Sequence, residues 1–227
     1  KHEPAWLRER REQAIDRFKV LGFPTTRHED WRFTNVSPVS SRHFPVDRTP
    51  DSSHVDEKAV GMFAYKRFPC HRMVFVDGWY APALSSLRNI PNGAIIANFT
   101  EAVANHGDII KPYLTQLASF ENNAFTALNT AFMHDGAVVF LPRGTDVCNP
   151  VHILNITTSR GDGKANHLRN LIICEASSGI QVVEDYVALD DTAVSFNNAV
   201  TEIFAGDNAE VHHYLIERGN KVSYSFT

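Results

Sequence analysis

Two adjacent histidines, His212 and His213, are the most evident candidates for metal ligands in the sequence. They lie in the β-branched run Val211–Ile216, which predicts a strand, so their side chains should point to opposite faces and cannot jointly bind one ion. Either histidine could be a ligand only if Cys174, Glu184 or another chain supplied further donors. We expect one of them to face solvent and the other to be hydrogen-bonded or solvated.

Two pairs of acids, Glu184-Asp185 and Asp190-Asp191, could bind calcium or supply the two carboxylates of a glycosidase. Both kinds of site need carboxylates at set distances in space, and solvated turns explain these acids more simply. The sequence also lacks the G-x-S-x-G elbow, the H-E-x-x-H helix and the G-x-x-x-x-G-K-[ST] loop. We therefore assign no catalytic, cofactor-binding or metal-binding residue, and we expect the protein not to be an enzyme.

The three cysteines, Cys70, Cys148 and Cys174, lie far apart and form no C-x-x-C pair. Their spacing is typical neither of a disulfide-rich protein nor of a zinc ribbon, and it favours a reduced, cytoplasmic compartment. Cys174 ends the apolar run that starts at Leu171, so it resembles a small core residue. Cys148 precedes Asn149-Pro150 in a predicted turn and should be exposed.

Composition limits the class of protein. The chain has 227 residues, 43% of them hydrophobic, and a formal net charge of −4, which suits one large domain or a domain with an appendage. No pervasive basic field would attract nucleic acid or anionic lipid, and residues 170–227 hold two basic and nine acidic side chains. No apolar run approaches the roughly 18 residues of a membrane span. We expect a cytoplasmic protein, or an organellar one if a leader has been removed.

Helical periodicity predicts three helices in the first part of the chain. The first begins after Pro4 and ends at Gly22, where a left-handed residue is wanted. Asp108 and Asn123 are the predicted N-caps of the other two, and the last of these ends before Gly136.

The segments between these helices read as a loop, an aromatic anchor and a hairpin. Residues 38–54 are rich in Ser, Pro, Asp and Arg and predict a loop. Residues 73–80 predict a hairpin that turns at Asp77-Gly78. Trp31 and Phe33 should lie on one face of an extended segment, where they would anchor the first helix rather than bind a ligand.

Beyond Gly136 the sequence changes to short β-branched runs separated by Gly, Asp, Asn and Ser, which predict strands. The runs are Ala137–Leu141, Val151–Ile156, Leu171–Cys174, Ile180–Val183, Tyr186–Leu189, Val200–Phe204 and Val211–Ile216. Residues 176–182 and 205–211 align at an offset of 29. Short strands without helices between them and an approximate repeat predict a β-solenoid, with a β-sandwich as the alternative. Val222–Thr227 alternates apolar and polar residues and stops without a cap, which favours a solenoid cut within its fold.

Two long stretches carry a resemblance. Gly22–Thr34 (GFPTTRHEDWRFT) and Phe75–Ser85 (FVDGWYAPALS) resemble the N-terminal region of the SufB/SufD family of iron–sulfur cluster assembly scaffold proteins, and within it the SufD type. Residues 166–187 and 196–215 resemble the opening coils of that family's β-helix, but they do not separate SufD from its paralogue SufB. The resemblance spans nearly the whole chain.

The resemblance implies a three-part architecture: a helical and irregular N-terminal region, a right-handed parallel β-helix and a C-terminal helical domain. We therefore predict a mainly β fold class, with the N-terminal helical and irregular region over residues 1–136 and the first coils of the β-helix over residues 137–227. The remaining coils and the C-terminal domain would lie beyond Thr227.

The function that the resemblance implies is that of a non-catalytic scaffold, which acts with SufB and the ATPase SufC while a cluster is built and handed on. The SufC contact region and the cluster-site positions would lie beyond Thr227, so no site residue is carried over. We expect the chain alone to bind neither nucleotide nor cluster, because a cluster needs several converging thiolates or histidines. We also expect self-association through the exposed last coil. The alternatives are a SufB-type paralogue, or a β-helix enzyme that acts on polysaccharide through the acids of Glu184–Asp191.

Overall fold

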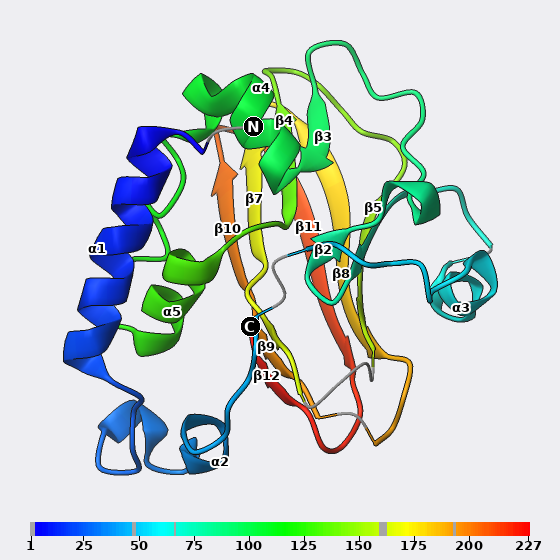
Figure 1. Cartoon of the computed structure of the whole chain (residues 1–227). Helices are drawn as coiled ribbons and strands as arrows, with labels where there is room; N and C mark the ends of the chain where they lie inside the picture. The colour runs from blue at the N-terminus through cyan, green and yellow to red at the C-terminus, as the bar shows by residue number, and fades with distance from the viewer. Residues whose placement is uncertain (1–2, 47–48, 66, 159–162, 193) are drawn as a thin grey trace.

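The computed structural model describes residues 3–46, 49–65, 67–158, 163–192 and 194–227. The helices are α1 (Ala5–Leu21), η1 (Glu29–Trp31), α2 (Ser37–Ser40), α3 (Glu57–Phe63), η2 (Pro82–Leu84), α4 (Phe99–Ile110) and α5 (Ala124–Phe132). The strands are β1 (His71–Val76), β2 (Trp79–Tyr80), β3 (Ile95–Asn98), β4 (Ala137–Leu141), β5 (Val151–Thr157), β6 (Ala165–Asn166), β7 (Arg169–Cys174), β8 (Gly179–Ala188), β9 (Phe196–Asn198), β10 (Val200–Ala205), β11 (Glu210–Arg218) and β12 (Tyr224–Phe226). The strands form the centre of the molecule, with α1 and α5 on one side and α3 on the other (Figure 1).

The strands assemble into three sheets. A five-stranded sheet has the order β11-β8-β5-β1-β2, a four-stranded sheet has the order β10-β7-β4-β3, and a three-stranded sheet has the order β12-β9-β6. The pairs β1–β2 and β3–β4 are antiparallel, and the other strand pairs in these sheets are parallel. Successive strands after β7 go to the five-stranded, the three-stranded and the four-stranded sheet in turn.

The predicted fold class, a mainly β protein with the first coils of a β-helix, is wrong. The chain is a mixed α/β structure whose sheets contain both parallel and antiparallel pairs and whose helices cover the sheets from outside. The change of sequence pattern at Gly136 suggested that the sheets start there, but β1 and β3 precede Gly136 and belong to the two larger sheets. Local periodicity shows where strands lie and not which distant strands join them. The division at residue 136 stays a prediction.

The register of the paired strands differs from the 29-residue offset of the sequence repeat. Ile180 of β8 pairs with Val211 of β11, 31 positions later, and Val182 pairs with His213. A shift of two residues keeps each side chain on the same face of the sheet, so hydrophobic alternation cannot distinguish the two registers.

The main core lies between the two larger sheets. It joins side chains of β1, β5 and β8 in one sheet to side chains of β4 and β7 in the other, among them Phe75, Ile153, Val182, Val139 and Ile172, all of which are buried. β-branched residues dominate these strands and fill the space between two pleated surfaces.

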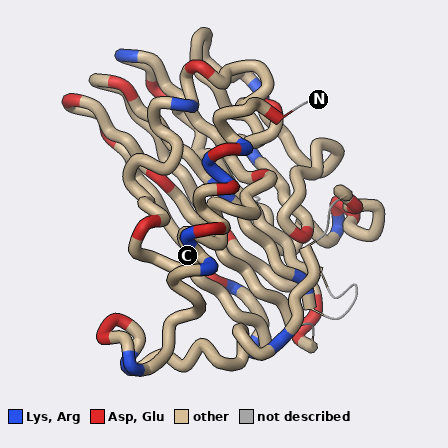
Figure 2. Tube along the Cα trace, turned by 60° about the vertical axis from the view of Figure 1, so that its left-hand side comes forward, with Lys and Arg blue, Asp and Glu red and all other residues tan. Residues whose placement is uncertain are grey.

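Helices bury the outer faces of the sheets. Leu7 of α1 and Phe99 of α4 pack on Val138 and Leu171 of the four-stranded sheet. Val60 of α3 belongs to the cluster on the opposite side, over β1, β5 and β8. Basic and acidic residues both occur along α1, which comes forward in Figure 2.

The first and third predicted helices are confirmed. Helix α1 ends at Gly22, whose φ is 64°, and Asn123 caps α5 by accepting a hydrogen bond of 3.0 Å from the backbone of Thr126. The helix predicted to start at Asp108 is wrong, because Asp108 lies near the end of α4 and turns follow it. The hairpin at Asp77-Gly78 is confirmed.

The aromatic anchor is confirmed for only one of its two residues. The Trp31 ring lies 5.0 Å from the ring of Phe125 and 5.9 Å from that of Phe226, whereas Phe33 is 93% exposed. The segment is a 3-10 turn over Glu29–Trp31 and not extended, so the two aromatic residues do not share a face. Among the described helices, none is both long enough and apolar enough to span a membrane.

Candidate functional site

Glu184 is the centre of a polar cluster inside the sheets. Its side chain is buried, and it accepts hydrogen bonds from Asn170 Nδ2 at 2.8 Å, from Thr201 Oγ1 at 2.8 Å and from the hydroxyl of Tyr186. The Nε2 atom of His213 lies 2.9 Å from Glu184 Oε2. Besides Tyr186 of its own strand, the Glu184 carboxylate therefore has partners from three other strands, β7, β10 and β11.

The cluster holds the Tyr186 hydroxyl in its protonated form. Burial and the adjacent Glu184 carboxylate raise the pKa of Tyr186 well above its ordinary value. The phenol therefore stays protonated and donates a hydrogen bond to Glu184. The carboxylate also orients His213 with Nε2–H towards it, as acidic groups do for histidines in metal sites. Its oxygens are engaged by four side chains, so Glu184 can position its neighbours but is poorly placed to abstract a proton from a substrate.

Asp185 occupies the opposite face of β8. It is fully buried, and it lies 3.2 Å from His152 Nε2 and accepts a hydrogen bond of 3.0 Å from Arg218 Nε. Burial alone would raise the pKa of Asp185, but the hydrogen bonds from His152 and Arg218 outweigh it and lower the pKa. The Tyr65 ring covers His152 at 4.8 Å.

The prediction that Glu184 and Asp185 lie in a solvated turn is therefore wrong. The runs Ile180–Val183 and Tyr186–Leu189 are largely one strand, β8, which pairs with β5 along one edge and β11 along the other, and the side chains of Glu184 and Asp185 are both buried. The alternation Ile180, Val182, Glu184, Tyr186 was a signal that placed Glu184 on the apolar face. Asp190 and Asp191, in contrast, lie in the loop after β8: Asp191 is exposed in a bend, and the half-buried Asp190 accepts a hydrogen bond of 2.7 Å from the backbone of Thr192.

The other candidate residues are separated in space. His212 is exposed and lies 2.7 Å from Glu210, whereas His213 contacts the buried Glu184, so the two adjacent histidines point to opposite faces of β11, as predicted. Cys174 is buried and Cys148 is exposed, and both predictions are confirmed. In the part of the chain that the structure describes, no group of three or more His, Cys, Asp or Glu side chains could hold a metal ion.

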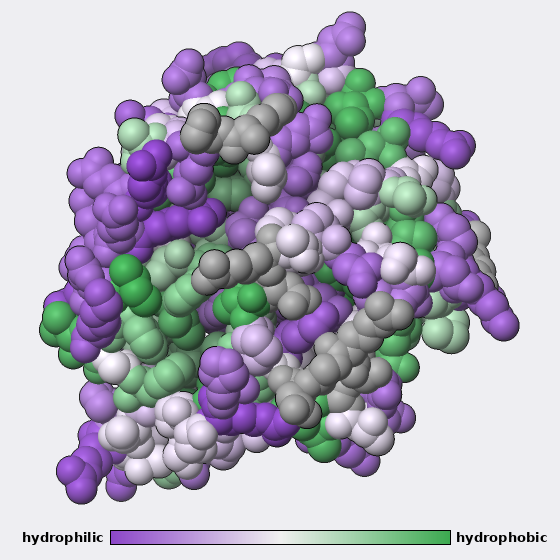
Figure 3. All heavy atoms as spheres, viewed as in Figure 1, coloured by the Kyte–Doolittle hydropathy of each residue, from purple (hydrophilic) through white to green (hydrophobic). Residues whose placement is uncertain are grey.

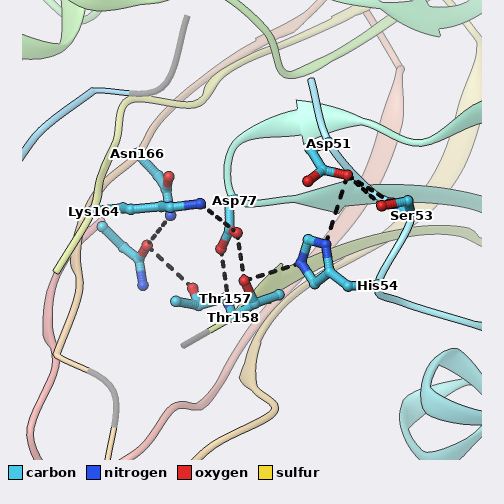
Figure 4. A network of polar contacts seen from close by, with 9 residues as sticks. Asp51, Ser53, His54, Asp77, Thr157, Thr158, Lys164 and Asn166 are labelled. Atoms are coloured by element: carbon cyan, nitrogen blue, oxygen red, sulfur yellow. Dashed lines mark hydrogen bonds and ion pairs between the residues drawn. The ribbon is translucent and has the colours of Figure 1, made fainter. Parts of the chain in front are cut away.

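A second polar network, which the sequence analysis missed, surrounds the hairpin turn (Figure 4). The buried Asp77 accepts hydrogen bonds from the Thr158 backbone at 2.7 Å and hydroxyl at 2.5 Å, and Lys164 Nζ lies 3.2 Å away. His54 Nε2 lies 3.2 Å from the Thr158 hydroxyl. The Asp-Gly turn was predictable, but the carboxylate's partners come from distant segments. This network joins three parts of the chain, which is a structural role.

An open groove of about 780 Å³ lies on the outer face of the five-stranded sheet, beside β11. Its apolar lining includes Tyr65, Phe68, Val183, Tyr214 and Leu215, and the last two are about half exposed. Exposed apolar surface of this extent is typical of a face that another chain covers.

Two family models match almost the whole chain. Residues 1–153 match the model of the SufBD protein N-terminal region, and residues 155–227 match that of the SufBD core domain of the SUF system for FeS cluster assembly. The chain belongs to the SufBD family. The resemblance of Gly22–Thr34 and Phe75–Ser85 to that family is thereby confirmed.

Three SufBD relatives illustrate the extent of the similarity. An iron–sulfur cluster assembly SufBD family protein of Synechocystis sp. is 29% identical over 98% of this chain and 50% of its own length. The iron–sulfur cluster assembly protein SufD of Bacillus subtilis is 27% identical over 95% of this chain and 49% of its own. An Arabidopsis thaliana SufBD family protein is 24% identical over 94% and 48%. The chain spans about half the length of the curated relatives that it matches.

Proposed function

We propose that this protein is a non-catalytic scaffold subunit of SUF iron–sulfur cluster assembly, of the SufD type, that acts with a SufB-like subunit and a SufC-like ATPase. The observation that carries the proposal is the match of both SufBD models along the chain. The similarity to a Bacillus subtilis protein named SufD supports the finer assignment.

The geometry of the acids supports a scaffold over a polysaccharide-active enzyme. A glycosidase needs two carboxylates that face each other across the substrate, one of them protonated. Glu184 and Asp185 point to opposite faces of β8, are buried, and are engaged by hydrogen bonds from within the protein. The apolar groove beside β11 is instead the kind of surface through which a subunit acts on partners.

Co-expression of the tagged full-length protein with its SufB-like and SufC-like subunits tests the assignment. The proposal expects one complex that contains all three proteins. Capture of a SufD-like subunit in place of the SufB-like one would identify this protein as the SufB-type paralogue. Absence of any SUF subunit from the purified material contradicts both assignments.

We also propose that this chain alone binds neither nucleotide nor an iron–sulfur cluster. Burial raises the pKa of the Cys174 thiol to about 11, so the thiolate that a cluster needs is disfavoured there. Anaerobic incubation with iron and sulfide should leave the protein colourless. Stoichiometric visible absorbance that disappears in Cys148→Ser or Cys174→Ser would overturn this proposal.

We also propose that the protein acts in the cytoplasm, or in an organelle after removal of a leader. The support is chemical, because Cys70, Cys148 and Cys174 are all free thiols in the structure. Fractionation of cells that express the tagged protein tests it, and recovery from an oxidising compartment contradicts it.

A further inference from the structure

A cavity of about 340 Å³ lies between α1, α5 and the segment that follows α2, separate from the groove beside β11. Its walls are mainly apolar, and they include the aromatic side chains of Phe18, Phe23, Phe44, Phe132 and Phe196. Apolar surface gathers in this region, over α5 and the lower half of α1, on the face shown in Figure 3. Cavities of this size with mostly apolar walls and few polar groups are typical of small-molecule sites.

His167 is the buried polar side chain of this cavity. It is 2% exposed and lies between two of the aromatic walls, with ring centroids 5.5 Å from Phe132 and 5.7 Å from Phe196. Burial, with a smaller contribution from His134, lowers the pKa of His167 to about 3, so the ring is neutral near pH 7.

The tautomer of His167 follows from its one side-chain hydrogen bond. Its Nδ1 atom lies 3.2 Å from Asn198 Nδ2, which donates a second hydrogen bond to the Phe125 carbonyl, so Nδ1 is the acceptor. The proton of the neutral ring is therefore on Nε2. Among the described residues this N–H makes no hydrogen bond, and it is not one of the fully enclosed polar atoms, so an acceptor in the cavity that His167 lines can reach it.

We propose that this cavity binds an uncharged aromatic carbonyl compound of one or two rings, whose oxygen accepts a hydrogen bond from His167 Nε2–H. The aromatic walls favour a planar ring, which can make face and edge contacts with several phenylalanines. A neutral acceptor suits the buried donor better than a carboxylate does, because an ion would lose its hydration without an opposite charge at that depth. Arg42 and His43 line the cavity as exposed residues, so a charged substituent would have to remain at that solvent-facing end.

Two probes of equal shape test the proposal: 2-acetonaphthone, which has a carbonyl oxygen, and 2-ethylnaphthalene, which has none. Titration calorimetry on the full chain should show the ketone binding about fivefold more tightly, the effect of one added hydrogen bond. His167→Phe should remove this preference. His212→Phe, the same substitution on the exposed face of β11, should retain it.

A measurement on the unsubstituted protein keeps the test decisive if His167→Phe does not fold. The NMR signal of His167 Nε2–H should shift and exchange more slowly with the ketone and not with the hydrocarbon. Equal affinities for the two probes, no binding of either below millimolar concentration, or a ketone preference that survives in His167→Phe would each overturn the proposal.

Discussion

Arg169 and Glu202 form a fully buried ion pair, with Arg169 Nη2 2.5 Å from Glu202 Oε2. The carboxylate also accepts backbone hydrogen bonds from Thr115 at 2.8 Å, Leu117 at 2.9 Å and Ala118 at 3.1 Å. One side chain of β10 thus holds the turn after α4 and neutralises an arginine of β7. Buried ions are tolerated only when they are paired and hydrogen-bonded in this way.

Glu202→Gln should destabilise the protein by about 3 kcal/mol or more, because it leaves the Arg169 charge buried without a counter-ion. Urea unfolding followed by circular dichroism measures the change in free energy. Glu210→Gln is the matched control, since that glutamate is exposed beside His212, and it should change stability by less than about 0.5 kcal/mol. A loss of the same small size in both variants contradicts the importance of the pair.

His167 should make folding sensitive to acid. Its pKa is about 3 in the folded protein, and an unfolded histidine titrates near 6.5. Between these two pH values the histidine is protonated in the unfolded chain but not in the folded protein. The resulting loss of stability is small above pH 6.5 and grows as the pH falls from 6.5 towards 3. Between pH 7 and pH 5, His167→Phe should lose about 2 kcal/mol less stability than the unsubstituted protein. Urea unfolding at the two pH values checks this, and equal losses in both proteins would count against it.

At the scale of elements, the junction between α5 and β4 depends on one glycine. Gly136 has a φ of 147°, and a Cβ atom at this position would lie 2.1 Å from the carbonyl oxygen of Arg169. The backbone of Phe99 donates a hydrogen bond of 2.7 Å to the Gly136 carbonyl, so α4 and β4 meet at the same point. A side chain here would separate β4 from β7.

Gly136→Ala should therefore destabilise the protein by about 3 kcal/mol, since the clash is with backbone that cannot rotate away. Gly61→Ala in α3 is the opposite case: no atom lies within 4 Å of the added Cβ, and alanine favours a helix by up to about 1 kcal/mol. Thermal unfolding of both variants distinguishes the two effects. Similar melting temperatures would mean that the junction relaxes around the methyl group.

At the scale of the whole molecule, the three sheets each end on a late strand. Among the described residues, β10, β11 and β12 have a neighbour on one side only, and β11 is the longest of them. An edge strand presents unpaired backbone donors and acceptors, and Tyr214 and Leu215 add exposed apolar area, 53% and 45% of each residue.

We expect this chain to self-associate through β11 as its concentration rises, and sedimentation velocity should show the species. Tyr214→Lys with Leu215→Lys should shift the equilibrium to monomer, because charge on an edge strand opposes pairing. Val20→Lys with Met62→Lys, at positions 75% and 65% exposed on helices, is the control and should not. A monomer at all concentrations, or equal effects of both pairs, would refute the edge as the contact.

Sequence alone was enough for features that local signals define. A helix stop at Gly22, an N-cap at Asn123 and an Asp-Gly turn act within a few residues, and each is found where it was predicted. The strand runs after Gly136 and the family membership were equally readable, because periodicity and motif spacing are properties of the chain itself.

Only the tertiary structure decided which polar groups are buried and what they contact. Glu184 meets His213, and Arg169 meets Glu202, across strands that are far apart in sequence but adjacent in a sheet. The register of those strands, the mixed α/β architecture and the cavity at His167 depend on how turns and helices bring distant segments together. A charged or imidazole side chain has the same local signature in a solvated turn as in a core, because its burial is determined by partners supplied from elsewhere in the chain.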